Sequence, residues 1–165
     1  MIKQTFINFD KDKCKILKFK DNVNVPGCNK IKIDKNTMTL KKNIHIISDF
    51  SDFKKTDVMN VRTLYIKENC IASTKNIHAF QNLTRLYIEK NSLNDLVDIE
   101  NLKHLTQLDF YAGILYKLSD FSNLKKMTSL SLSNASLYKI DFSKLPHSII
   151  YLELSTNKIT DISGI

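Results

Sequence analysis

The chain has 165 residues, which is the length of one ordinary domain, and hydrophobic residues make up 42% of it, enough to build a packed core. These values exclude a chain that is disordered throughout. The formal net charge of +8 makes the chain basic, and no apolar run approaches the roughly 18 residues that a membrane-spanning helix needs.

The cysteines and the N-terminal residues indicate a cytoplasmic protein. Cys14, Cys28 and Cys70 are an odd number and contain no C-x-x-C pair, which argues against a disulfide framework and against a structural zinc site. Residues 1–13 contain no apolar stretch of the kind found in secretory signal peptides. We therefore expect reduced thiols and no signal peptide.

Residues 1–60 show β-strand patterns without a fixed period. The apolar residues of 7–9 and 16–19 flank the sequence D-K-D-K, which predicts two strands joined by a tight turn. Two more strands are expected at 31–33 and 44–47. We expect residues 1–60 to form a β-rich cap that covers the open end of the repeats that follow.

Lysine is concentrated in the same N-terminal segment. Residues 1–60 hold 13 Lys and Arg against 7 Asp and Glu, a net of +6, which leaves +2 of the total of +8 for residues 61–165. A lysine patch attracts phosphate, so RNA, a ribosome or an acidic membrane surface is a candidate partner, and a plain solvated surface is the alternative. The residues of this basic patch are Lys11, Lys13, Lys15, Lys18, Lys20, Lys30, Lys32, Lys41 and Lys42.

Residues 61–165 repeat with a period of 22, in four complete repeats and a fifth that stops at its position 17. Apolar residues recur at positions 1, 4, 6 and 11, and the step of two between positions 4 and 6 is the period of a β-strand. A period of this length is typical of a solenoid, in which stacked repeats share one core. Position 4, for example, holds Leu64, Leu86, Leu108, Leu130 and Leu152, and position 6 holds Ile66, Ile88, Phe110, Leu132 and Leu154.

Position 9 of the repeat marks the point where the chain leaves the strand. Asn91 and Asn157 occupy it in two repeats, and an amide there can satisfy backbone groups that would otherwise be buried without a partner. Gly113 and Ala135 occupy the same position in two other repeats. In those repeats we expect another source of hydrogen bonds or a looser turn.

The pattern L-x-x-L-x-L-x-x-N-x-L, which runs from Leu83 to Leu93 and recurs with isoleucine replacements from Ile149 to Ile159, resembles that of leucine-rich repeat proteins. The period and the tail Ile159–Ile165 are similar to the short-repeat subclass found in bacterial internalins and in the regulatory subunit of protein phosphatase 1. The resemblance implies an α/β solenoid, mostly β. It would be right-handed and curved, with parallel strands on the concave face and short turns or 3-10 segments on the convex face.

Both ends of the repeat array carry further expectations. A degenerate repeat is expected within the cap, with Ile31, Ile33, Asn36 and Met38 at positions 4, 6, 9 and 11. A short helical turn or loop carrying Phe50, Phe53, Val58 and Met59 is expected to return from the last irregular repeat before residue 61. No polar capping segment follows the fifth repeat. Either the chain continues in the native protein, or the incomplete fifth repeat is a sufficient cap, or this end of the stack contacts a partner.

The outward positions of the strands form a candidate binding face. Side chains at positions 2, 3, 5, 7 and 8 are expected to point away from the core, and equal positions form ladders because adjacent strands lie about 4.8 Å apart. Tyrosine and arginine, the usual anchors of protein interfaces, gather on the first three strands, and the alternative is that the tyrosines only pack across the sheet. The predicted partner-binding residues are Arg62, Tyr65, Lys67, Arg85, Tyr87, Glu89, Lys90, Asp109 and Tyr111.

The sequence contains no catalytic or cofactor-binding motif. The four histidines fall outside any H-E-x-x-H or similar ligand set, and three glycines are too few for phosphate-binding loops. We therefore expect no enzymatic activity, no metal and no cofactor, and a protein–protein interaction module that binds through its concave face. The alternatives are a basic accessory factor of a ribosome or other ribonucleoprotein, docked through the N-terminal lysines, and a phosphatase regulatory subunit, which rests on fold analogy alone.

Overall fold

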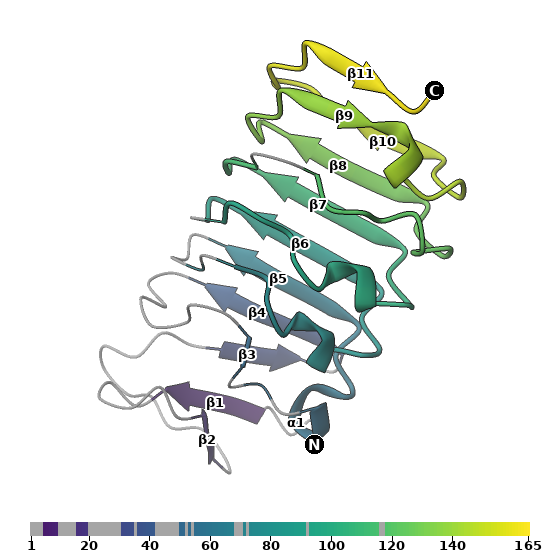
Figure 1. Ribbon diagram of the computed structural model, residues 1–165. Coiled ribbons are helices and arrows are strands. Elements are labelled where there is room, and N and C mark those ends of the chain that lie inside the picture. The colour runs from purple at the N-terminus through teal and green to yellow at the C-terminus, as the bar shows by residue number, and fades with distance from the viewer. Residues whose placement is uncertain are drawn as a thin grey trace.

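A computed structural model describes residues 5–9, 16–19, 31–34, 36–41, 50–51, 53, 55–67, 71, 73–91, 93–115 and 118–165. Within these ranges one sheet of nine strands runs the length of the molecule, in the order β10-β8-β7-β6-β5-β4-β3-β1-β2 (Figure 1). The strands are β1 (Thr5–Phe9), β2 (Ile16–Phe19), β3 (Ile31–Asp34), β4 (Thr37–Lys41), β5 (Thr63–Lys67), β6 (Arg85–Glu89), β7 (Gln107–Tyr111), β8 (Ser129–Ser133) and β10 (Tyr151–Glu153).

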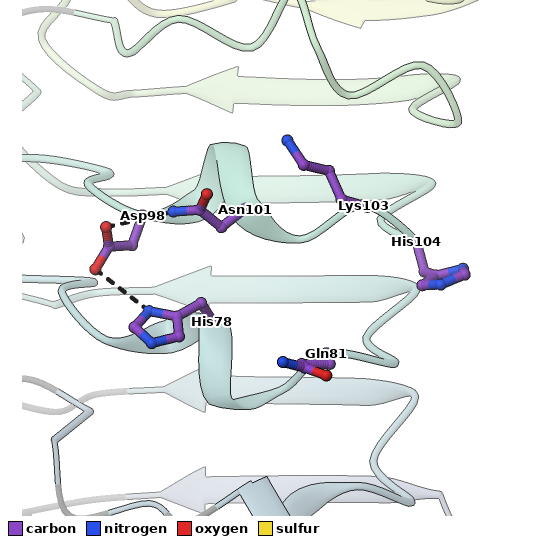
Figure 2. Close-up of a pocket in the computed structure, with 6 residues that line it drawn as sticks. All are labelled: His78, Gln81, Asp98, Asn101, Lys103 and His104. Carbon is purple, nitrogen blue, oxygen red and sulfur yellow. Dashed lines mark hydrogen bonds and ion pairs between the residues drawn. The ribbon is translucent and has the colours of Figure 1, made fainter.

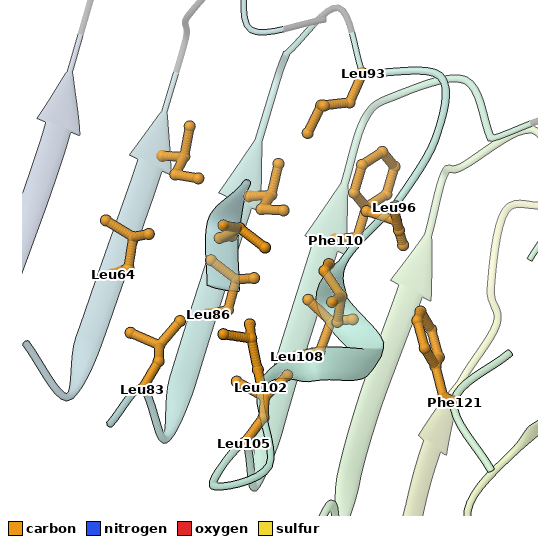
Figure 3. Close-up of a cluster of buried hydrophobic side chains, with 14 of the residues drawn as sticks. Leu64, Leu83, Leu86, Leu93, Leu96, Leu102, Leu105, Leu108, Phe110 and Phe121 are labelled. Atoms are coloured by element: carbon orange, nitrogen blue, oxygen red, sulfur yellow. The ribbon is translucent and has the colours of Figure 1, made fainter. Parts of the chain in front are cut away.

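The strands β5, β6, β7, β8 and β10 are parallel and in register, as the period of 22 predicts, and β4 pairs parallel with β5. Leu64 pairs with Leu86, Leu86 with Leu108, and Leu108 with Leu130, so position 4 forms one continuous row. The side chains at positions 1, 4, 6 and 11 are buried in the four complete repeats and partly buried in the fifth. Figure 3 shows this core between the sheet and the returning segments. The expected parallel-strand solenoid is confirmed.

Asparagine at position 9 has the predicted role. The Nδ2 atom of Asn91 donates hydrogen bonds to the carbonyl oxygens of Ile66 (3.0 Å) and Glu89 (2.8 Å). Asn157 does more, because its Oδ1 atom also accepts from the backbone N–H groups of Ala135 (3.0 Å) and Leu137 (3.1 Å). Each amide therefore joins its own repeat to the preceding one and satisfies buried backbone groups.

Gly113 stands at position 9 because of its neighbour at position 6. A Cβ atom on Gly113 would lie 2.6 Å from the Cε1 atom of Phe110, well inside van der Waals contact. The large Phe110 ring is fully buried and fills the space that an asparagine takes in other repeats. The repeat exchanges volume between positions 6 and 9, and close packing permits only one large group there.

Position 2 stabilises the stack, although the sequence places it on the outward face. The hydroxyl groups of Thr84 and Thr106 each donate to the position-2 carbonyl of the preceding repeat, Arg62 and Thr84, over 2.9 Å. Thr128 repeats the contact with Thr106 at 3.4 Å. The threonines at position 2 therefore link each repeat to the preceding one by a hydrogen bond.

The N-terminal strands pair antiparallel, with β1 between β2 and β3, and β3 pairs antiparallel with β4. This confirms the predicted strands at 7–9, 16–19 and 31–33, while the turn at 10–13 and the strand at 44–47 lie outside the described residues. The predicted register of the degenerate repeat was wrong. Met38 pairs with Leu64 and Leu40 with Ile66, so Met38 and Leu40 occupy positions 4 and 6, and the antiparallel β3 cannot supply them.

The returning segments are mostly irregular. They contain the helix α1 (Lys55–Val58), the 3-10 helices η1 (Ile77–Ala79), η2 (Ile99–Asn101) and η3 (Phe142–Lys144), and two short strands, β9 (Lys139–Asp141) and β11 (Asp161–Ser163). The 3-10 segments were expected from the resemblance, whereas the parallel pair of β9 and β11 was not. No helix among the described residues is long and apolar enough to cross a membrane.

Three aromatic rings close the core beside α1. Phe50 and Phe53 pack on Phe80, with ring centroids 5.9 and 5.3 Å away. Phe50, Phe53 and Val58 are buried, as expected for the return of the last irregular repeat before residue 61. Met59 does not join this cluster, since 49% of it is exposed.

Candidate binding surface on the strand face

The outward side of the sheet carries a pair of stacked tyrosines. Tyr65 on β5 and Tyr87 on β6 are register partners, and their rings lie 4.5 Å apart with planes only 9° from parallel. Tyr65 is 39% exposed and Tyr87 is half-buried. Burial raises the pKa of Tyr87, the charges of Tyr65 and Asp109 add to this rise, and a hydrogen bond with Arg85 opposes it. The structure thus brings Tyr65, Tyr87 and Arg85 together.

An ion pair borders the stacked tyrosines at position 7. The Nζ atom of Lys67 lies 2.7 Å from the carboxylate of Glu89, and the Nζ atom of Lys90 lies 3.7 Å from it. The hydrogen bond from Lys67 holds the pKa of Glu89 below its usual value. Glu89 is the register partner of Tyr111, so this second group of predicted residues extends from β5 to β7.

Asp109 lies beside Tyr87 in the next strand and differs from Glu89 in its environment. Its carboxylate accepts a hydrogen bond from the Nε2 atom of Gln107 (3.0 Å), and it forms no ion pair within the described part of the chain. Burial raises its pKa above the usual value. Tyr111 ends the same strand with 48% of its surface exposed.

Arg62, one of the predicted partner-binding residues, makes its hydrogen bond to a loop and not to the tyrosine pair. Its Nη1 atom donates to the carbonyl of Asn82 (3.0 Å), and the side chain of Asn82 donates in turn to the carbonyl of Met59 (2.8 Å). Arg62 stands at position 2, where the next three repeats place threonine. It therefore fixes the loops at the edge of the sheet, apart from the tyrosine pair.

Comparisons with known proteins address the fold. No family model matches the sequence, and no curated protein matches it. Among solved structures, internalin C2 from Listeria monocytogenes superimposes with a TM-score of 0.62 at 18% identity, over 78% of this chain and 60% of that chain. An internalin F structure from the same organism gives 0.52 at 20% identity, over 64% of this chain and 35% of that chain. This chain has a leucine-rich repeat fold. It spans about 60% of the internalin C2 chain and about a third of the internalin F chain.

Three of the nine lysines of the predicted basic patch fall in strands that the structure describes. Lys18, Lys32 and Lys41 fall in β2, β3 and β4, and the side chains of these residues lie outside the described part of the structure. The remaining lysines of the patch, Lys11, Lys13, Lys15, Lys20, Lys30 and Lys42, fall outside the described residues altogether. The basic patch stays a prediction.

The returning side of the leucine-rich repeats has a polar depression that the sequence reading missed. It has a volume of about 560 Å³, lies between η1 and η2, and is lined by His78, Gln81, Asp98, Asn101, Lys103 and His104 (Figure 2). The Nδ1 atom of His78 lies 3.6 Å from Asp98, whose carboxylate also accepts from the backbone N–H of Asn76 (2.7 Å). Gln81 and Lys103 stand 22 residues apart, so aligned polar columns could have revealed the depression.

The chemistry of this depression is that of a solvated surface. The Asp98 carboxylate already bonds the backbone of the preceding repeat, so it has a structural use. Among the residues that the structure describes, no three His, Cys, Asp or Glu side chains gather in a metal-binding arrangement. The strand face, with its exposed rings, remains the stronger candidate for binding.

Proposed function

We propose that this chain is a non-enzymatic protein–protein interaction module that binds its partner through the strand face of its leucine-rich repeats. The observation that carries the proposal is the stacked pair of the exposed Tyr65 and the half-buried Tyr87 on the outward side of the sheet. Tyrosine buries much area at low entropic cost and keeps a polar end, which makes it a frequent anchor of protein interfaces.

The surroundings of the tyrosine pair support the same function. Lys67, Glu89 and Arg85 provide charged groups of both signs around the rings, which is the arrangement of a polar rim about an aromatic centre. The registered strands hold every one of these side chains on a rigid sheet, so a partner would meet a preorganised surface.

The odd number of cysteines supports a location in the cytoplasm.

The proposal is tested by changing both tyrosines to alanine. The variant Tyr65→Ala/Tyr87→Ala should fold, because both side chains point outward, and should lose its partner in a crosslinked pull-down from the source cell. Tyr138→Ala is the matched control, since Tyr138 is 52% exposed and lies beside β9 on the returning side. Equal recovery of the partner by the wild type, the double variant and the control would contradict the proposal.

Docking to a ribonucleoprotein through the N-terminal lysines predicts a different result. The chain would then sediment with ribosomal particles at low salt and leave them at high salt, because phosphate contacts weaken as salt rises. Replacing Tyr65 and Tyr87 would not change that sedimentation. The strand-face proposal instead requires that partner binding depends on these two tyrosines.

A further inference from the structure

The strand β8 presents only small side chains to solvent. Its sequence S-L-S-L-S buries both leucines and turns Ser129, Ser131 and Ser133 outward, and we call these three residues the serine rung. The neighbouring strands carry larger groups at the same heights. In the register, Ser131 lies between Asp109 on β7 and Glu153 on β10.

The two carboxylates beside the serine rung have no cationic partner among the described residues. Adjacent strands lie about 4.8 Å apart, so the backbones of Asp109 and Glu153 are separated by about 10 Å with the short Ser131 between them. Glu153 accepts hydrogen bonds from the backbone N–H of Ser155 (2.8 Å) and the hydroxyl of Tyr151 (3.3 Å). Within the described ranges neither carboxylate meets a Lys, Arg or His, whereas Glu89 on the same face is paired with Lys67.

Exposed phenol rings flank the same place. Tyr111 ends β7 and Tyr151 begins β10, with 48% and 54% of their surfaces exposed. The hydroxyl of Tyr151 donates to the Glu153 carboxylate (3.3 Å), and the charges of Glu153 and Asp109 both raise the pKa of Tyr151. Carboxylates and aromatic faces together attract cations, and a guanidinium uses both through paired hydrogen bonds and stacking.

We propose that the serine rung receives an arginine side chain of the protein partner, with its guanidinium over Ser131 between Asp109 and Glu153. This inference rests on the proposed function, because it names the chemistry that the same strand face recognises. The local charge supports it, since β7, β8 and β10 expose two carboxylates and no cationic side chain. A second copy of this chain is a poorer occupant. Its basic N-terminal segment contains lysine but no arginine, and lysine offers only a point charge.

The direct test measures binding of two fluorescein-labelled peptides by fluorescence anisotropy. One peptide carries arginine at alternate positions, and the other carries citrulline, a neutral analogue of the same shape, at those positions. The wild-type chain should bind the arginine peptide more tightly. Asp109→Asn and Glu153→Gln should each weaken that binding by about tenfold, as expected for loss of a charge-assisted hydrogen bond.

Two further variants sharpen the test. Glu100→Gln removes one negative charge from η2 on the returning side and should leave binding of the arginine peptide unchanged. Ser131→Lys places a cation of the chain's own on the serine rung and should abolish that binding. Ser131→Lys and Glu153→Gln change partly exposed side chains on two other strands, so the test does not depend on Asp109→Asn alone.

Three results would overturn the inference. The first is equal affinity for the arginine and citrulline peptides, including no binding of either. The second is an equal loss of affinity in Glu100→Gln. The third is a dimer in sedimentation equilibrium that Asp109→Asn dissociates, which would assign the serine rung to a second copy. If the partner still depends on Tyr65 and Tyr87 in the pull-down, the proposed function stands while the arginine assignment fails.

Discussion

At the scale of single residues, the molecule is governed by the exchange of volume between neighbouring positions of one repeat. Position 6 and position 9 share a space, which Phe110 and Gly113 divide as large and small. In the next repeat Leu132 and Ala135 divide it less unevenly, and in the last repeat Leu154 leaves room for Asn157. A substitution at one position should therefore be tolerated only if the other position changes with it.

We predict that Gly113→Ala lowers the free energy of unfolding by about 1–3 kcal/mol, the usual effect of overpacking a core. The reason is the approach of the added Cβ atom to the buried Phe110 ring. In the background Phe110→Leu the same change should cost much less, and urea titration of the four proteins gives the coupling between the two sites. Additive effects of the two substitutions would contradict this account.

The role of a single residue could be predicted from the sequence where its position in the repeat determines that role. The asparagines at position 9 were assigned to backbone groups from their spacing, and both described examples behave so. The role of Gly113 could not be predicted, because it depends on the orientation of one aromatic ring. The Oδ1 atom of Asn91 has no hydrogen-bond partner within the described residues, in contrast to the Oδ1 atom of Asn157.

At the scale of elements, neighbouring strands of the strand face shift the pKa values of their carboxylates in opposite directions. On β6, Glu89 is stabilised as an anion by Lys67. On β7, Asp109 is half-buried and its pKa is raised by that burial, so its ionised form is disfavoured in the folded state. A charge that weakens its own strand is typical of positions kept for binding.

We predict that Asp109→Asn makes the protein more stable than the wild type at neutral pH. A raised folded-state pKa means that the contribution of Asp109 is complete below its unfolded value of 3.8 and is lost as pH rises through the folded value. The advantage of the variant should therefore shrink as pH falls below 3.8, as measured by urea unfolding at both pH values.

Glu89→Gln is the control, for which we expect a change in stability of the opposite sign. The pKa of Glu89 is lowered by Lys67, so the ion pair contributes above the unfolded pKa and its contribution is lost as pH falls through the folded value. This variant should be less stable than the wild type at neutral pH, by less than about 1 kcal/mol because the pair is partly exposed. The same pH response in both variants would refute the assignment of the Asp109 environment.

The strands themselves followed from the sequence, while several connections did not. Alternation of apolar and polar residues identified β5, β6, β7, β8 and β10 and their outward positions. The strands β9 and β11 were missed because their pairing is a contact between two returning segments, and three residues carry too little alternation to reveal it. Arg62 was assigned to the binding face from its position, yet its contact with Asn82 depends on a loop whose path no spacing encodes.

At the scale of the whole molecule, the fold is a one-dimensional stack. Each inner repeat packs on two neighbours, whereas among the described strands β10 pairs only with β8, and Leu152 and Leu154 of the last repeat are only partly buried. Stability in such a stack is a sum over neighbouring repeats, so end repeats are the easiest to open. The period of 22 made this architecture predictable, and the departure from the period before residue 61 hid the register of Met38 and Leu40.

We predict a gradient of amide hydrogen exchange along the solenoid. Amides of β6 and β7 should exchange most slowly, because their opening exposes the fully buried Leu86 and Leu108 and breaks contacts on both sides. Amides of β10 should exchange faster under native conditions. Exchange at β10 as slow as at β7 would show that the chain opens as one unit and not one repeat at a time.

The stacked pair of tyrosines also makes the molecule its own optical probe. The chain has six tyrosines and no tryptophan, so its near-ultraviolet absorption and dichroism arise mainly from phenol rings. Two parallel rings 4.5 Å apart couple their electronic transitions, and they are the rings that a ligand on the open face would cover or pull apart. A titration followed by dichroism would therefore report occupancy of that face without any attached label.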